Sequence, residues 1–182
     1  MKISADILSR FIAVEQTGHD LRMLLDDVGL EVKRHDGSRF TLELLANRGD
    51  HHCYQGLARE LSGRTGATLC GPEITALETG SCPVPLHLES PLCGVYTATL
   101  LERVGDDAAL TEADLAPLEA AEIHSLTAPV DATNLSNLEL GQPTHAFDAD
   151  TIVGGITIRA SREGEQAWPL FAEDKVTLAA GT

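Results

Sequence analysis

One stretch of the chain, from Asp131 to Asp148, concentrates side chains that could carry out chemistry. It places Asn134, Gln142 and His145 around the end of an expected helix and a Gly-Gln-Pro turn. Binding groups often lie in loops that rigid elements hold in place. An imidazole in such a loop can donate a hydrogen bond to a substrate or position a water molecule. We therefore predict that Asp131, Asn134, Gln142 and His145 belong to a binding site.

A purely structural interpretation of the same residues stays open. His145 can simply hold the turn, while Asp131 and Asn134 make local caps through hydrogen bonds to the backbone. His51 and His52 are adjacent, and neighbours in sequence point to different sides of a helix, so joint chelation by this pair is not expected. The chain shows no Cys/His/Asp spacing typical of a metal site, and we predict no metal and no cofactor.

Hydrophobic periodicity predicts the elements that must position these groups. In the first third, apolar residues recur at helical spacing in two places, and two short runs between them have the pattern of strands. Ser4 is expected to cap a first helix that runs through Phe11 and Ile12. The further elements expected here are a helix opened by Thr17, strands at 30–34 and 40–44, and a helix at 51–65.

The remainder of the chain has a weaker pattern. Thr111 and Asp114 have the spacing of a capping box, and a later helix is expected to stop near Gly141. The other predicted elements are strands at 84–88, 95–104 and 176–178, two short strands separated by a gap within 152–159, and a helix at 132–138. We predict an α+β fold with a helix–strand N-terminal domain at residues 1–72 and an incomplete mixed α/β domain at residues 83–182.

Charge is distributed unevenly along the 182 residues. Residues 1–66 have a net charge of −1, whereas residues 67–182 have a net charge of −14. A surface that binds nucleic-acid phosphates needs clustered Lys and Arg. Nucleic-acid contacts are therefore expected from the first third, at Arg48 and Arg59, and such binding should be weak and sensitive to salt.

Composition also restricts the cellular context. No apolar run approaches the roughly 20 residues that a membrane span requires, and we expect no membrane association. The first residues lack an apolar signal-peptide region. The four cysteines have no paired spacing and are expected to be reduced thiols, so a cytoplasmic protein is predicted.

Several motifs together resemble the β subunit of bacterial phenylalanyl-tRNA synthetase. The longest is Asp131 to Asn134 followed by the run Leu138 to Asp148, which is similar to a segment of that family's editing domain. Shorter matches, in the same order as in the family, are Met1 to Ser4, Gly29 to Val32, Asn47 to Asp50 and Gly56 to Leu61. The resemblance implies that His145 is the catalytic residue and corresponds to the editing histidine, which acts in hydrolysing mischarged tyrosyl-tRNA. It also implies that Asp131, Asn134 and Gln142 are substrate-binding residues.

Two departures from that family change what the resemblance implies. An oligonucleotide-binding domain usually precedes the Asn-Arg-x-Asp motif, but only seven residues separate Val32 from Phe40 here. The family also continues beyond the position of Thr182 into a stretch that completes the editing pocket. No class II ATP-binding motif is visible, since aminoacylation in the family belongs to the α subunit.

Three hypotheses on function follow, and the sequence does not choose between them. The chain could bind or edit aminoacyl-tRNA as a β-subunit-like module. It could instead be a recruited paralogue that binds an amino-acid-like ligand or a protein partner without catalysis. The third hypothesis is an inactive fragment. Expected partners are tRNA, a synthetase-like α subunit or a second copy of the chain. Either of the two protein partners would cover strand edges left open in the second domain.

Overall fold

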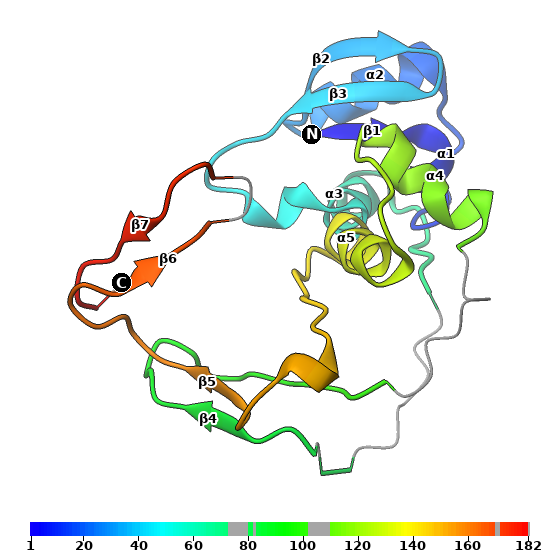
Figure 1. Ribbon diagram of the computed structural model, residues 1–182. Coiled ribbons are helices and arrows are strands. Elements are labelled where there is room, and N and C mark those ends of the chain that lie inside the picture. The colour runs from blue at the N-terminus through cyan, green and yellow to red at the C-terminus, as the bar shows by residue number, and fades with distance from the viewer. Residues whose placement is uncertain (73–79, 82, 102–109, 170–171, 182) are drawn as a thin grey trace. The chain divides into compact units, whose positions relative to one another are not determined.

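The computed structural model describes all residues except 73–79, 82, 102–109, 170–171 and 182 (Figure 1). The chain divides into a first unit, residues 1–76 and 105–146, and a second unit, residues 77–104 and 147–182. The described residues form both helices and short strands, which confirms the predicted α+β class. The α-helices lie in the first unit, whereas the described residues of the second unit form short strands and the 3-10 helix η2 (Ala149–Thr151). The predicted domain boundary between residues 72 and 83 stays a prediction.

The first unit is built around a three-stranded antiparallel sheet in the order β1-β3-β2 (Figure 1). Its elements are β1 (Lys2–Ser4), α1 (Ala5–Leu8), α2 (Gly18–Asp27), β2 (Glu31–Asp36), β3 (Arg39–Glu43), η1 (Gly49–His52), α3 (Tyr54–Thr65), α4 (Glu112–Ala120) and α5 (Ala128–Leu140). The two predicted strands are confirmed as β2 and β3. Only Gly37 and Ser38 join them, with Gly37 at a φ of 57°, so no domain lies between these strands.

The first predicted helix is shorter than expected. Ser4 caps α1 as predicted, accepting a hydrogen bond from the Asp6 amide, but the helix ends at Leu8 and does not reach Ile12. The backbone of the following residues instead bonds to residues 68–70. The Ala13 amide donates to the Thr68 carbonyl at 3.0 Å, and the Cys70 amide donates to the Phe11 carbonyl at 2.8 Å. Long-range pairing therefore replaced the last predicted helical turn.

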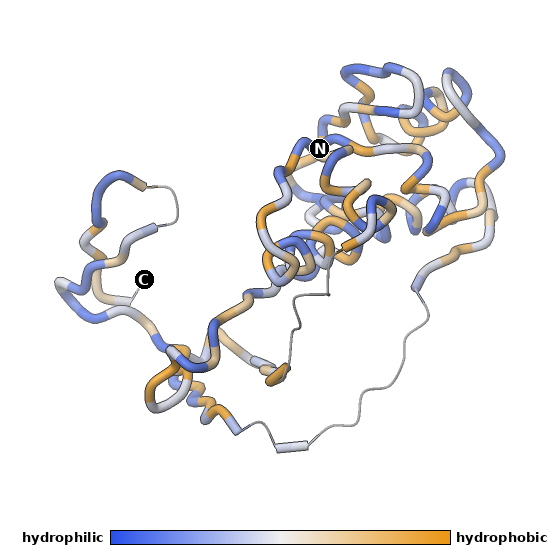
Figure 2. The backbone as a smooth tube through the Cα atoms, turned by 45° about the vertical axis from the view of Figure 1, so that its right-hand side comes forward, coloured by the Kyte–Doolittle hydropathy of each residue, from blue (hydrophilic) through white to orange (hydrophobic). Residues whose placement is uncertain are grey.

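The helix α3 supplies the centre of the hydrophobic core. Its predicted apolar stripe is confirmed, since Tyr54, Leu57, Ala58 and Leu61 are all fully buried. Figure 2 shows hydrophobic residues recurring along the chain in this part of the molecule. The Tyr54 hydroxyl accepts a hydrogen bond from the Ser4 amide at 3.0 Å, which ties α3 to the end of β1. Burial raises the pKa of Tyr54 to about 12.

Two further helices complete the first unit. The predicted capping box of α4 is confirmed, because the Thr111 hydroxyl and the Asp114 carboxylate each accept from the other's backbone amide. The other helix, α5, extends from Ala128 to Leu140 and is longer than the predicted 132–138. It ends, as predicted, at Gly141, which has a left-handed φ of 74°. In Figure 1, α5 lies beside α3, and the two helices are in contact.

The second unit contains two small sheets. A parallel pair joins β4 (Leu86–Leu88) to β5 (Ile156–Ile158), and an antiparallel pair joins β6 (Gln166–Ala167) to β7 (Val176–Thr177). Gly155 precedes β5 at a φ of 111°, and a Cβ there would lie 2.4 Å from the Pro85 carbonyl oxygen. Arg159 and Glu165 form a two-bond ion pair that braces the turn before β6.

Part of the predicted strand structure in this unit was wrong. Residues 95–101 of the predicted strand 95–104 form no strand, and its last three residues lie outside the described chain. Of the two short strands predicted within 152–159, the second is confirmed as β5, at residues 156–158. The first is wrong, since residues 152–153 form no strand and Val153 is 93% exposed. A strand needs a neighbouring strand that forms hydrogen bonds with its backbone. Residues 95–101 and 152–153 have an apolar pattern, but they pair with no strand within the described residues.

Two glycines of α3 provide a matched test of how η1 packs against this helix. A Cβ at Gly56 would lie 1.6 Å from the Asp50 carbonyl oxygen, whereas a Cβ at Gly63 would meet no atom within 4 Å. We expect G56A to lower the free energy of unfolding by about 1–3 kcal/mol through overpacking against a backbone group. G63A should raise it by about 0.5–1 kcal/mol through helix propensity. Urea unfolding followed by circular dichroism measures both, and equal effects of the two changes would contradict this packing.

Candidate functional site

The predicted site residues lie on α5 and in the loop that follows it. Asp131 is 2% exposed, and its carboxylate accepts from the Ser125 hydroxyl at 2.6 Å and from the Leu126 amide at 3.0 Å. It therefore closes the loop that enters α5. Both of these hydrogen bonds come from groups of the protein itself, so the geometry agrees with the structural interpretation of Asp131.

The other three residues are more accessible to solvent. Asn134 is half-buried on α5, while Gln142 and His145 are exposed in the loop beyond Gly141. The Ser136 hydroxyl donates to the Gln142 backbone carbonyl at 3.3 Å, which holds the beginning of that loop on the helix. The His145 imidazole is thus open to solvent on a loop whose start is fixed. Catalytic or binding roles for these residues stay predictions.

A close contact between α5 and α3 fixes the point where this loop begins. Gly141 lies so near Cys53 that a Cβ on the glycine would be 2.9 Å from the Cys53 Sγ. Cys53 is itself the N-cap of α3, where its sulfur accepts from the Gly56 amide at 3.3 Å. Gly141 is required both by its left-handed backbone and by the space available. The loop with His145 therefore starts from a tightly packed position in the first unit.

One ionisable residue near this loop was missed by the sequence analysis. Glu139 lies in the last turn of α5, and burial raises the pKa of its carboxyl group. It lies close enough to Tyr54 to raise the pKa of that phenol as well. Glu139 therefore faces the contact between α3 and α5. Its helical position and its place in the motif gave no indication of burial, because α5 has no clear apolar stripe in its sequence.

A second cluster of ionisable groups joins η1 to α3. The Arg48 guanidinium donates to both carboxylate oxygens of Asp50, at 3.0 and 2.9 Å, and to Glu60 at 2.5 Å. The hydrogen bond from Arg48 lowers the pKa of Asp50 to about 2 and also lowers the pKa of Glu60. The buried His51 adds its Nε2 atom 3.3 Å from Glu60. Arg48, predicted as an RNA contact, has its charge compensated by two carboxylates.

Three members of this cluster carry side-chain atoms that could serve as metal ligands and that lie close together. Ligand atoms of Asp50, His51 and Glu60 lie within 4.8 Å of one another. The spacing of these residues in the sequence did not predict the group, because only the fold brings Glu60 close to Asp50 and His51. Arg48 already supplies a cation that bonds to two of the three, so the cluster is satisfied as an ion network. The His51 Nδ1 atom is buried and has no hydrogen-bond partner within the described chain.

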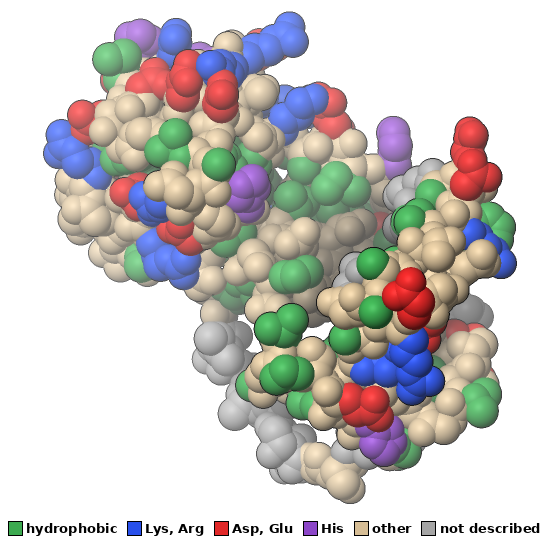
Figure 3. Space-filling model, turned by 90° about the vertical axis from the view of Figure 1, so that its left-hand side faces the viewer, with side chains coloured by type: hydrophobic (Ala, Val, Ile, Leu, Met, Phe, Trp, Pro, Cys, Tyr) green, Lys and Arg blue, Asp and Glu red, His purple; other side chains and the backbone are tan. Residues whose placement is uncertain are grey.

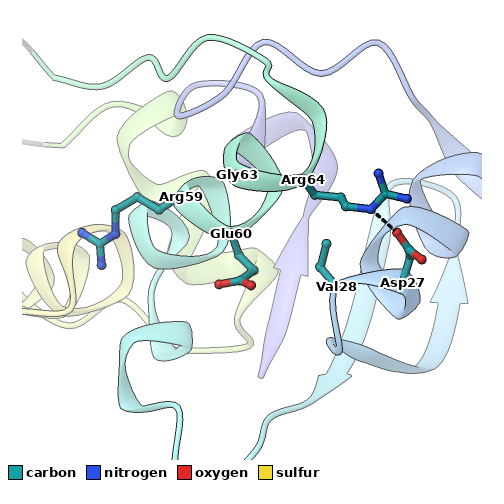
Figure 4. Close-up of a pocket in the computed structure, with 6 residues that line it drawn as sticks. All are labelled: Asp27, Val28, Arg59, Glu60, Gly63 and Arg64. Atoms are coloured by element: carbon teal, nitrogen blue, oxygen red, sulfur yellow. Dashed lines mark hydrogen bonds and ion pairs between the residues drawn. The ribbon is translucent and has the colours of Figure 1, made fainter.

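The second predicted RNA contact, Arg59, borders a shallow cavity of about 520 Å³ on the outer face of α3 (Figure 4). Its side chain is exposed and forms no ion pair with described residues. Arg64 lies on the other side of the cavity and bonds to Asp27 at 2.5 Å. Figure 4 shows the guanidinium groups of Arg59 and Arg64 pointing in opposite directions, so they do not converge on one small anion.

Comparison with known proteins connects these features to a family. The family described as "B3/4 domain" matches residues 92–182, which include α4, α5 and the loop with His145. The chain belongs to the B3/4 domain family. This assignment agrees with the motif from Asp131 to Asp148, which lies entirely within the matched residues.

Similarity to individual proteins extends over most of the chain. It is 39% identical over 152 residues to the phenylalanine–tRNA ligase β subunit of Neisseria meningitidis serogroup B, covering 80% of this chain and 19% of the relative. It is 34% identical over 182 residues to the β subunit of Ralstonia nicotianae, covering 98% of this chain and 21% of the relative. The predicted resemblance is confirmed, and this B3/4 protein spans about a fifth of the length of these relatives.

The buried carboxylate of Asp131 can be tested against its neighbour on the same helix. D131A would leave the Leu126 amide and the Ser125 hydroxyl without their acceptor, and we expect a loss of about 1–3 kcal/mol in the free energy of unfolding. N134A should change that free energy by less than about 0.5 kcal/mol, since the Asn134 side chain forms no hydrogen bond with described residues. Denaturant titrations of the two variants provide the measurement. A stable D131A variant would contradict the structural role.

The ion network predicts how stability depends on pH. Arg48 depresses the pKa values of Asp50 and Glu60 below their ordinary values of 3.8 and 4.5. The network therefore contributes stability above about pH 4.5, and this contribution is lost as the pH falls towards 2. The melting temperature of R48Q should lie below that of the parent at pH 7, and the difference should shrink on acidification.

A matched arginine provides the control for this pH dependence. Arg22 makes one exposed ion pair, with Asp26 at 3.6 Å. R22Q should therefore follow the acid dependence of the parent chain, since exposed single pairs contribute little. If R48Q and R22Q showed the same difference from the parent at every pH, the network would have no special role.

Proposed function

We propose that the chain is a β-subunit-like module that binds the aminoacyl end of a mischarged tRNA and hydrolyses its ester. The observation that carries the proposal is the exposed His145 on a loop anchored by Gly141, within residues that belong to the B3/4 domain family. The relatives are named as β subunits of phenylalanine–tRNA ligase, and tyrosine is the expected wrong amino acid. A cytoplasmic location accords with such a role.

The proposed chemistry is an ordinary ester hydrolysis. The oxygen of a water molecule attacks the ester carbonyl, and the bond between that carbonyl carbon and the ribose oxygen breaks. The ribose oxygen takes up a proton, which leaves a free amino acid and an uncharged tRNA. His145 would position the water or transfer the proton, since imidazole can do both near neutral pH. Asn134 and Gln142 would contact the substrate from α5 and the following turn.

Contacts to the tRNA backbone must come from outside this loop. From residue 104 to residue 158 the chain has ten Asp and Glu and no Lys or Arg. Such a segment repels phosphates and can bind only the neutral or cationic end of the substrate. Arg59 on the first unit is an exposed cation that could make a phosphate contact. A synthetase-like α subunit is the proposed partner that would provide further contacts to the tRNA.

A second function, binding of a protein partner without hydrolysis, is favoured by a separate observation. No described residue of the second unit is buried, and several large apolar side chains there are exposed. Figure 3 shows apolar side chains scattered among charged ones on the face in view. Short strand pairs with no buried core have little stability of their own, and a second chain that packed on this unit would cover these apolar groups.

Deacylation of misacylated tRNA tests the proposed activity. We expect the purified chain to hydrolyse Tyr-tRNA for phenylalanine faster than the matching Phe-tRNA at low ionic strength. H145A should slow the hydrolysis of Tyr-tRNA by at least about 100-fold, as removal of a general acid or base does. Release of labelled amino acid from each tRNA provides the rates.

An exposed histidine elsewhere in the first unit is the control. His19 lies in the first turn of α2, and H19Q should leave the deacylation rate unchanged. A parent chain that does not exceed the spontaneous rate would rule out editing by this chain alone. Equal rates for H145A and the parent would remove His145 from the mechanism.

A further inference from the structure

A second cavity, of about 460 Å³, lies where α4 ends and the chain turns towards α5. Its floor is apolar and is formed by Leu115, Leu118 and Ile123. Leu118 is 1% exposed, so the floor is continuous with buried structure. The exposed carboxylates of Glu112 and Glu119 stand among its lining residues. The cavity therefore combines an apolar floor with an acidic rim.

The turn after α4 holds this floor in place. Glu122 has a φ of 59°, the only positive value of a non-glycine residue among the described residues. The Glu122 amide donates to the Glu119 carbonyl at 3.0 Å, and the Ile123 amide donates to the Leu118 carbonyl at 2.9 Å. These bonds form a Schellman motif, which packs Ile123 against Leu118. Left-handed backbone is unfavourable for a non-glycine residue, and such strain is frequent at functional sites.

Cations of the sheet keep α4 in position on the first unit. Lys2 of β1 forms an ion pair with Glu122, and the Arg39 guanidinium of β3 lies 4.0 Å from Glu119. Glu112 forms no ion pair with described residues. Glu112 thus keeps an unpaired negative charge, while Arg39 partly compensates Glu119 and Arg10 donates to the Ala113 carbonyl at 3.2 Å. The surrounding segment from residue 104 to residue 158 adds no Lys or Arg of its own.

We infer that this cavity is a docking site for a basic amphipathic segment of a partner protein. Apolar side chains of that segment would enter between Leu115, Leu118 and Ile123, and its Lys or Arg side chains would meet Glu112 and Glu119. Amphipathic helices bind hydrophobic grooves in this way, and complementary charge favours the right partner. RNA is not the fitting occupant, because its phosphates would face the acidic rim. The inference is independent of hydrolysis at His145.

Peptide binding tests the docking site directly. The probe is an 18-residue amphipathic helical peptide of Leu and Lys, compared with a peptide of the same pattern made of Leu and Glu, at 150 mM salt. The Leu/Lys peptide should bind, and the double variant E112Q/E119Q should weaken its binding about five-fold, as expected from the loss of two exposed charge pairs. I123A should also weaken it about five-fold without a change in charge. Fluorescence anisotropy provides the dissociation constants.

A matched pair of exposed acids separates the site from general attraction to a chain of net charge −15. E15Q/E163Q makes the same change in net charge at residues that do not line the cavity and should alter binding less than two-fold. Amide hydrogen exchange of the parent chain should show protection by the peptide at residues 112–125. Equal weakening by both double variants, protection elsewhere, or equal binding of the Leu/Glu peptide would overturn the inference.

Two other occupants would appear as distinct results. If the chain sediments as a dimer and E112Q/E119Q shifts that equilibrium, a second copy occupies the cavity and the inference is wrong. Displacement of the peptide by an RNA hairpin through residues 112–125 would also overturn it. If H145A loses deacylation but still binds the peptide, the docking site stands. If the chain deacylates Tyr-tRNA but does not bind the peptide, the docking site alone is overturned.

Discussion

The close packing at the N-terminus of α3 determines the geometry of the first unit. Three contacts meet there within one helical turn. Gly56 allows the Asp50 carbonyl to approach the helix, Tyr54 bonds to the Ser4 amide, and Cys53 leaves room only for a glycine at position 141. Because protein interiors transmit small displacements, a shift of this turn would move β1, η1 and the end of α5 together. The loop with His145 depends on this packing for its starting position.

The ion network beside this turn serves the same geometry. Arg48 connects Asp50, which precedes α3, to Glu60, which lies two turns along that helix. Compensation of the arginine by two carboxylates explains why the motif Asn47 to Asp50 adds no free positive charge to the surface. Its contribution is the placement of η1 against α3. The exposed Arg59, by contrast, is free to interact with molecules outside the chain.

The second unit differs from the first in how its elements are supported. Its strands have two or three residues each, and short isolated pairs of this kind have little stability of their own. All of the residues in the described hydrophobic cluster belong to the first unit. Parallel strands such as β4 and β5 are normally covered on both faces. The exposed side chains of this unit therefore fit a role in which a partner covers it, while the acidic cavity beside α4 offers a separate surface for a basic segment.

The sequence by itself determined the features that depend on local order. The caps at Ser4 and Thr111, the apolar stripe of α3, the hairpin at Gly37 and the helix end at Gly141 all follow from residue type and spacing. The motif from Asp131 to Asp148 was also sufficient to identify the family. Only the tertiary structure decided that Asp131 closes a loop, that Glu139 is partly buried, and that Glu60 joins Asp50 and His51. It also decided that residues 95–101 form no strand, because strand pairing, burial and ionic contacts require groups that the chain brings together only when it folds.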